Sequence, residues 1–169
     1  MKRRHIVLFV AALCCFGLPA SADLLSYMTV FGANQGAIQG DSTFAGREGQ
    51  IPVMEYHHLV ERPEGQPIQY ETVIVTFEFD DRSLPNLINA MATNESLTVT
   101  VDFYRPDNVG VEEKYVTVTL TNAKVTSIEP LSPRSDDSAL IGFAASVRVR
   151  FSYQAITHQH IPSGGTASL

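Results

Sequence analysis

The sequence predicts a single domain with a mainly β fold, an antiparallel barrel or sandwich. Val and Thr are frequent, several runs alternate apolar and polar residues with a period of two, and Gly, Pro, Asn and Asp separate these runs. Only one segment has a convincing helical periodicity. The 169 residues are enough for one domain with a substantial core.

The first 22 residues are predicted to be a secretory signal and not part of the fold. A positive segment, residues 2–4, precedes an apolar run, residues 6–18, and a small-residue cleavage pattern, residues 20–22. We expect cleavage before Asp23, with an uncleaved membrane anchor as the alternative. The protein is therefore predicted to be secreted or periplasmic.

Both cysteines, Cys14 and Cys15, lie inside this signal. Leu13 precedes Cys14, whereas a bacterial lipid-attachment site needs a small residue there, so a lipoprotein is disfavoured. The sequence after the signal has no cysteine for a disulfide or a thiolate metal site. Loss of the signal's three positive charges changes the formal net charge from −6 to −9, which argues against nucleic acid and anionic membranes as partners.

The N-terminal half of the domain is predicted to contain three strands, at residues 24–31, 51–60 and 69–80. A stretch punctuated by Gly32, Gly36 and Gly40 separates the first two. The loop from Glu61 to Pro67 has the prolines and the glycine of a hairpin end. In the third strand the residues of one face are apolar, namely Val73, Val75, Phe77 and Phe79.

The single helix is predicted to follow Ser83, an N-cap residue, with Pro85 in its first turn. Its apolar face is predicted to comprise Leu84, Leu87, Ile88 and Met91. The helix is expected to be about two turns long.

Alternation predicts further strands at residues 97–104, 115–128 and 143–153, the second of them bent at Asn122. We predict that the domain ends at residue 160 and that residues 161–169 form a flexible tail. The second face of several strands is neither apolar nor strongly charged. Its residues include Ile74, Thr76, Thr98, Thr100, Thr117 and Thr119. Such a face suits either solvent or a partner surface.

Histidine pairs give weak signals for metal binding. His57 and His58 are adjacent on a predicted strand, so they point to opposite faces and cannot share a metal ion. His158 and His160 are two residues apart and can lie on one face, but no third ligand can be named. We therefore assign no metal site and expect a solvated strand end there.

No catalytic or cofactor-binding residue is assigned either. The acidic pairs Asp80-Asp81 and Asp136-Asp137 lie in loops, where neighbouring carboxylates more often cap and solvate than catalyse. Asn94-Glu95-Ser96 is a formal glycosylation sequon, relevant only in a eukaryotic secretory pathway. Phosphate-loop, nucleophile-elbow and zinc-protease motifs are missing from the sequence. The protein is not predicted to be an enzyme.

Several motifs, in order, resemble the haemolysin-coregulated protein (Hcp) family, the tube protein of bacterial type VI secretion. The later ones are "VDFYRPD", "KYVTVTLTNAKVTSIEP" and "VRVRFSYQAITHQH". The earlier ones are "QGAIQG", "GREGQIPVMEYHH" and "FDDRSLPNLINAM". Each motif alone is loose, but together they cover nearly all of residues 25–160.

This resemblance implies a small antiparallel β-barrel of two sheets with one short flanking α-helix. It also implies a homo-hexameric ring, stacking of rings into a tube, a lumen that can hold small effectors, and contacts with other type VI secretion components. It implies no catalytic residues. The signal and the short loop at residues 61–67 depart from the family pattern. They favour the alternative, an exported Hcp-like binding module or adhesin that does not form a tube, whereas the continuous order of the motifs favours the tube protein.

Overall fold

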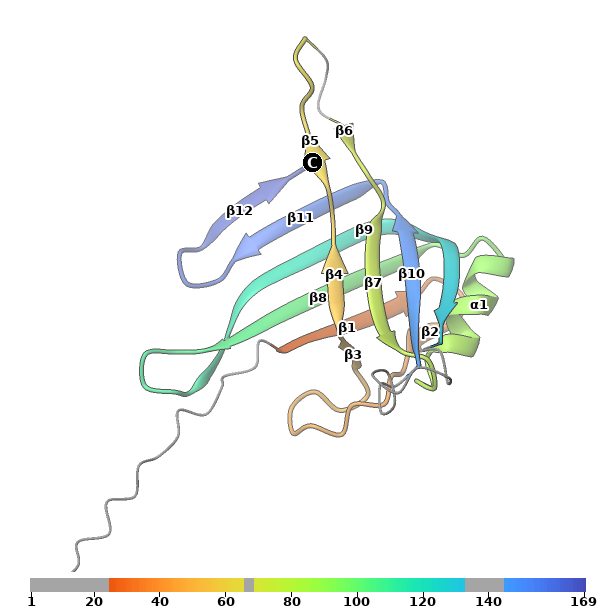
Figure 1. Ribbon diagram of the computed structural model, residues 1–169, viewed down its shortest axis with the longest axis horizontal. Helices are drawn as coiled ribbons and strands as arrows, with labels where there is room; N and C mark the ends of the chain where they lie inside the picture. The colour runs from red at the N-terminus through yellow and green to blue at the C-terminus, as the bar shows by residue number, and fades with distance from the viewer. Residues whose placement is uncertain (1–24, 66–68, 133–144) are drawn as a thin grey trace, which may run out of the picture.

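The structure, a computed structural model, describes residues 25–65, 69–132 and 145–169. The predicted signal, residues 1–22, and the acidic pair Asp136-Asp137 lie outside the described residues. Two antiparallel sheets form a small barrel, and one helix flanks it (Figure 1). The fold implied by the resemblance is therefore confirmed.

The first sheet has the order β2-β1-β8-β9-β11-β12, and β3 pairs with β1 as well. Its strands are β1 (Leu25–Gly32), β2 (Gly36–Ile38), β3 (Ile51–Val53), β8 (Leu97–Pro106), β9 (Glu112–Leu131), β11 (Ala155–His160) and β12 (Gly165–Ser168). The second sheet has the order β9-β10-β7-β4. Its further strands are β4 (Glu55–His57), β7 (Val73–Glu78) and β10 (Ser146–Ser152).

Two segments join the sheets and close the barrel. The first half of β9 pairs with β8 and β11, and its second half pairs with β10. Asn122, with a φ of 50°, lies between the halves, at the predicted bend. On the other side β3 belongs to the first sheet and β4 to the second, and the amide of Met54 between them donates to the carbonyl of Thr76 at 2.8 Å.

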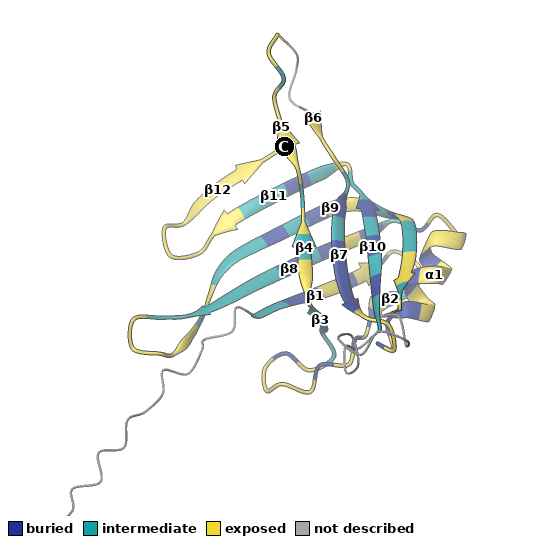
Figure 2. Cartoon of the chain, in the orientation of Figure 1, coloured by how far each residue is buried: buried dark blue, intermediate teal, exposed yellow. Residues whose placement is uncertain are grey.

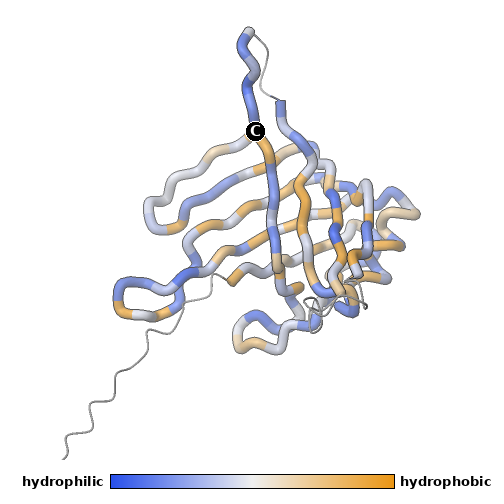
Figure 3. Tube along the Cα trace, in the orientation of Figure 1, coloured by the Kyte–Doolittle hydropathy of each residue, from blue (hydrophilic) through white to orange (hydrophobic). Residues whose placement is uncertain are grey.

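The core fills the space between the sheets because alternate residues of each strand point inward. Figure 2 shows the buried residues along the inner strands, and Figure 3 shows that these stretches are hydrophobic. The largest fully buried side chains are those of Phe77, Phe151, Met28, Ile51, Leu87, Leu97, Leu120 and Ile156. Val73, Val75 and Phe77 form the predicted apolar face of β7, whereas Phe79, beyond its end, is exposed.

Helix α1 (Leu84–Ala92) begins after Ser83 as predicted and packs against β9. The Ser83 hydroxyl does not cap it, and the carboxylate of Asp81 accepts the Ser83 amide at 2.9 Å instead. Leu84 and Leu87 are buried, but the predicted face is wrong at Ile88 and Met91, which are exposed. The helix meets the barrel along a narrow strip that Ala90 completes.

Three further expectations need correction. The predicted strand 51–60 is divided into β3, β4 and β5 (Val60–Glu61), because the chain bends as it passes between sheets. The predicted strand 143–153 is β10 within the described residues, and a turn separates it from β11. The predicted flexible tail, residues 161–169, contains β12, whose backbone pairs with β11. No helix in the described part of the chain is long and apolar enough to cross a membrane.

Candidate assembly surface

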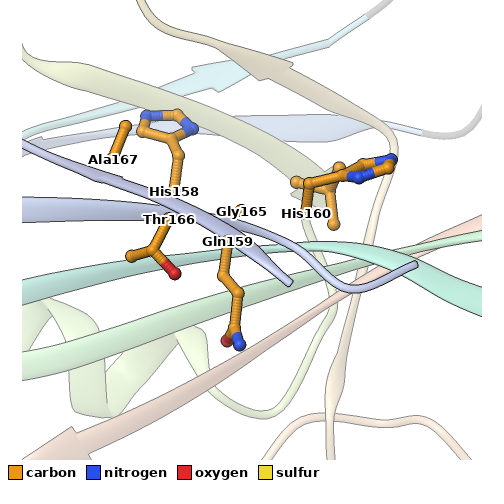
Figure 4. A pocket seen from close by; sticks show the side chains of 7 residues that line it. His158, Gln159, His160, Gly165, Thr166 and Ala167 are labelled. Carbon is orange, nitrogen blue, oxygen red and sulfur yellow. The ribbon is translucent and has the colours of Figure 1, made fainter. Parts of the chain in front are cut away.

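The histidines and carboxylates considered for chemistry are spread over the fold. His57 is exposed on β4, whereas His58 is half-buried. His158 and His160 both line an open hollow of about 440 Å³ beside the β11–β12 hairpin. Figure 4 shows His158 and Ala167 on one side of this hairpin, with Gln159 and Thr166 on the other. Within residues 25–65, 69–132 and 145–169, no group of three or more His, Cys, Asp and Glu side chains could hold a metal ion.

Two acidic residues from the loop pair and the sequon, Asp81 and Glu95, accept hydrogen bonds from backbone amides. Asp81 is buried, and its carboxylate accepts the amides of Ser83 and Asp41. Glu95 of the sequon is buried as well. One of its oxygens accepts the amides of Asn34 and Gln35 at 2.5 and 2.8 Å, which fixes the β1–β2 turn.

Hydrogen bonding to Gln35 is the main cause that lowers the pKa of Glu95, because it favours the ionised carboxylate. Gly32 leaves room for this carboxylate, since a Cβ there would lie 2.5 Å from one Glu95 oxygen. Sequence reasoning missed Glu95 as a structural residue. Its anchoring partners lie some sixty residues away in the chain.

The outward-pointing side chains of the first sheet form a threonine face. It comprises Thr29, Thr98, Thr100, Thr117, Thr119, Thr121 and Thr157. One row crosses four strands in register, because Thr29 pairs with Thr100, Thr100 with Thr119, and Thr119 with Thr157. The predicted Thr-rich second face is therefore present on this sheet. Thr76 of β7, by contrast, is buried and donates to Glu55.

Charge on the threonine face is confined to one end. Asp102 accepts a hydrogen bond from the Thr117 hydroxyl at 2.6 Å, and Lys114 lies 3.4 Å from the same carboxylate. Elsewhere the face carries threonine hydroxyl and methyl groups together with the exposed ring of Phe31, which pairs with Thr98. These groups are uncharged and are not suited to acid–base or metal chemistry.

A strand pair projects beyond the end of the barrel (Figure 1). It consists of β5 and β6 (Gln69–Tyr70), which pair with each other through Val60 with Tyr70 and Glu61 with Gln69. This pairing confirms the hairpin predicted around Glu61–Pro67. Leu59, Val60 and Tyr70 are 39%, 43% and 52% exposed. Within the described residues no strand of the barrel pairs with this strand pair.

Aromatic side chains hold the base of the strand pair against the barrel. The His58 Nε2 lies 2.7 Å from the Tyr153 hydroxyl, and Tyr70 stacks on Tyr153 with ring centroids 5.7 Å apart. His58 also stacks on His158 of β11, with centroids 5.9 Å apart and planes 14° from parallel. Burial lowers the pKa of both imidazoles, and the proximity of His158 lowers that of His58 further.

The hairpin between β8 and β9 forms a second projection, at one end of the first sheet (Figure 1). The carboxylate of Asp107 accepts the amides of Val109 and Val111 at 2.9 and 2.8 Å, which shapes the turn. Val109 is 82% exposed, and Figure 3 shows hydrophobic residues between hydrophilic ones at this tip. Exposed apolar groups therefore lie on both projections of the domain.

A buried arginine that the sequence analysis missed, Arg47, ties this hairpin to the loop between β2 and β3. The Arg47 guanidinium forms an ion pair with Glu112 and lies over the rings of Tyr27, Phe44 and Tyr104. Its central carbon is 3.6 Å from the centroid of the Tyr104 ring. The interaction supports a folded loop and provides no reactive group.

Comparison with known proteins gives a consistent result. Residues 27–160 match the family model described as "Type VI secretion system effector, Hcp". The chain is 31% identical over 160 residues to the "Major exported protein" of Pseudomonas aeruginosa, which covers 85% of this chain and 92% of that protein.

Solved structures agree with the family match. A crystal structure of an Hcp protein has a TM-score of 0.77 and 27% identity, with coverage of 87% of this chain and 97% of that one. The secreted protein Hcp3 from Pseudomonas aeruginosa has a TM-score of 0.73 and the same identity and coverage. The sequence match, the barrel and its flanking helix lead to one conclusion: this chain belongs to the Hcp family of type VI secretion proteins.

Proposed function

We propose that this protein is a structural subunit that assembles into homo-hexameric rings, and that the rings stack into the tube of a type VI secretion system. Membership of the Hcp family supports this role. The proposal needs no catalytic residue, cofactor or metal, and it assigns the surface of the domain to assembly.

The strand pair β5–β6 is the observation that carries the proposal. It extends away from the barrel and exposes Leu59, Val60 and Tyr70. A small strand pair beyond the core gains little from its own chain, because an isolated two-stranded hairpin is marginally stable in water. Packing against a neighbouring copy would bury these apolar groups and order the pair.

The threonine face is proposed to line the lumen of the ring. In-register threonines across β1, β8, β9 and β11 make a wall of hydroxyl and methyl groups with little charge. Such a wall would let small effector proteins enter without strong electrostatic retention. Cargo carriage and contacts with other secretion components belong to the same proposal.

Export is proposed to begin with the signal at residues 1–22, cleaved before Asp23. The signal places the protein outside the cytoplasm, in the periplasm or the medium. The similarity to a relative named "Major exported protein" supports an exported product. Mass spectrometry of the protein from the producing cell would give the N-terminus, and an intact Met1 would contradict cleavage.

The first test is light scattering after size exclusion on residues 23–169, which retains every described residue. We expect the mass of six chains and closed rings in negative-stain images. A clean monomer at tens of micromolar would contradict the ring. It would favour an exported Hcp-like binding module or adhesin, the alternative that keeps the barrel without assembly.

A further inference from the structure

His58 occupies the point where the chain leaves the barrel for the strand pair β5–β6. The register between β4 and β7 ends at His57 with Ile74, and the strand pair begins at Val60. The side chains of His58, just before β5, and of Tyr70, in β6, connect the strand pair to the barrel. Both side chains contact Tyr153, and His58 also contacts His158 of β11.

Among the residues that the structure describes, no negatively charged side chain pairs with either of the two stacked imidazoles. Tyr153 packs against His58 with its phenol ring, and Tyr70 stacks on Tyr153. His57 adjoins His58 in the chain, and His160 lies two residues beyond His158. Glu71, next to Tyr70, is exposed. Among the described residues, no carboxylate forms a hydrogen bond or ion pair with either imidazole. Two protonated rings in this stack would therefore repel each other without a neutralising partner.

We propose that the His58–His158 pair is a pH-sensitive contact that orients the strand pair β5–β6 at neutral pH and releases it in acid, thereby disassembling the ring. The ring part of this inference rests on the proposed function. Release of the strand pair concerns contacts within one chain and stands independently of it.

The direction of the pH effect follows from the environment of the rings. Burial lowers the pKa of both imidazoles below the ordinary value of 6.5, so the folded contact favours neutral rings. Once the strand pair is released, the imidazoles regain their ordinary pKa near 6.5 and therefore bind protons at a higher pH than in the folded contact. The contact is therefore complete above about pH 6.5 and is lost as the pH falls below it.

The test compares residues 23–169 of the wild type with His158→Phe, which keeps an aromatic ring but cannot take a proton. His160→Phe is the matched control, because it changes an exposed histidine on the same strand. Hydrogen–deuterium exchange, corrected for the intrinsic effect of pH, reports protection of residues 58–61 and 69–71. Light scattering at each pH between 7.5 and 5 reports the assembly.

We expect the wild type and His160→Phe to lose protection at these residues and to fall from ring mass towards monomer mass below about pH 6.5. We expect His158→Phe to keep both to a lower pH than the wild type, because it removes one titrating ring and the repulsion between the two rings, while burial still opposes protonation of His58. His158→Gln, which is also non-titrating, gives the same answer if the phenylalanine variant does not fold.

Each contrary outcome has a separate meaning. Protection that is independent of pH in the wild type, or acid release at the same pH in the His158 variants as in the wild type, would overturn the inference. Rings that persist at pH 5 in the wild type would overturn its assembly part. Absence of rings at every pH, with acid release that His158→Phe shifts to lower pH, would instead contradict the proposed function and leave the contact supported.

Discussion

At the scale of single residues, Arg47 is the clearest case of a charged group used for structure. It is 9% exposed, its guanidinium lies over Tyr27 and Tyr104, and it forms an ion pair with Glu112. Burial of a charge is costly unless it is paired, and the planar guanidinium suits both the carboxylate and the ring faces. Arg47 thereby fixes its own loop on the β8–β9 hairpin.

We expect Arg47→Ala to lower the free energy of unfolding by about 3 kcal/mol, because it removes the buried ion pair and the ring contacts together. Urea denaturation measures the change. Arg47→Lys keeps the charge but not the planar stacking, so we expect its free energy of unfolding to lie between those of the wild type and Arg47→Ala. Arg62→Ala is the matched control at an exposed arginine, where the change should stay within about 0.5 kcal/mol. Equal midpoints for Arg47→Ala and Arg62→Ala would contradict this account.

For single residues, the sequence predicts the direction of a side chain on a strand but not its distant contacts. The outward direction of Thr98, Thr100 and Thr119 could be predicted, because side chains alternate along a strand. The contact between His58 and His158 could not, since it joins residues a hundred positions apart, one just after β4 and the other on β11. A single sequence carries no information about which distant side chains meet.

At the scale of elements, local sequence patterns predicted which strands and helices exist better than they predicted where each one begins and ends. The strand predicted from alternation at 24–31 is present as β1 (Leu25–Gly32), and the predicted bend lies at Asn122. The helix begins after Ser83 as predicted, although the Ser83 hydroxyl does not cap it. The run 51–60 reads as one strand because alternation continues through it. It is divided because β3 pairs with the first sheet and β4 with the second, and the alternation of side chains gives no information about such pairing.

Strand β12 was missed because its residues, Gly165–Ser168, are small and exposed and lack an apolar face. Backbone pairing with β11 holds it in place. The amide of Leu169 donates to Ile156, and Ile156 donates in return, so this is a hydrogen-bonded pair. Pairs alternate along an antiparallel ladder, so Ala167 with His158 is hydrogen-bonded and Ser168 with Thr157 is not.

This alternation gives a prediction with a control in the same strand. Proline has no amide hydrogen, so Ala167→Pro removes a ladder bond to β11, whereas the amide lost in Ser168→Pro points away from it. We expect Ala167→Pro to cost roughly 1–2 kcal/mol in urea denaturation and Ser168→Pro clearly less. Equal losses in the two variants would contradict the pairing of β12.

At the scale of the whole molecule, folding and assembly place different demands on the surface. The core between the two sheets accounts for the barrel, but it does not account for exposed apolar groups on a strand pair outside it. Exposed substitutions have small effects on folding. A change on this strand pair should therefore separate assembly from stability, which changes in the core cannot do.

We expect Val60→Asp to abolish rings while leaving the free energy of unfolding within about 0.5 kcal/mol of the wild type, because Val60 is 43% exposed and would meet a neighbouring copy only in the ring. Light scattering measures the mass, and urea denaturation at a concentration where both proteins are monomeric measures the stability. Val109→Asp introduces the same charge at an 82% exposed valine on the β8–β9 hairpin, and rings should persist in this variant. If Val60→Asp formed rings as well as Val109→Asp did, the strand pair would not be the interface. Loss of rings in both variants would mean that added negative charge alone prevents assembly of an already acidic chain.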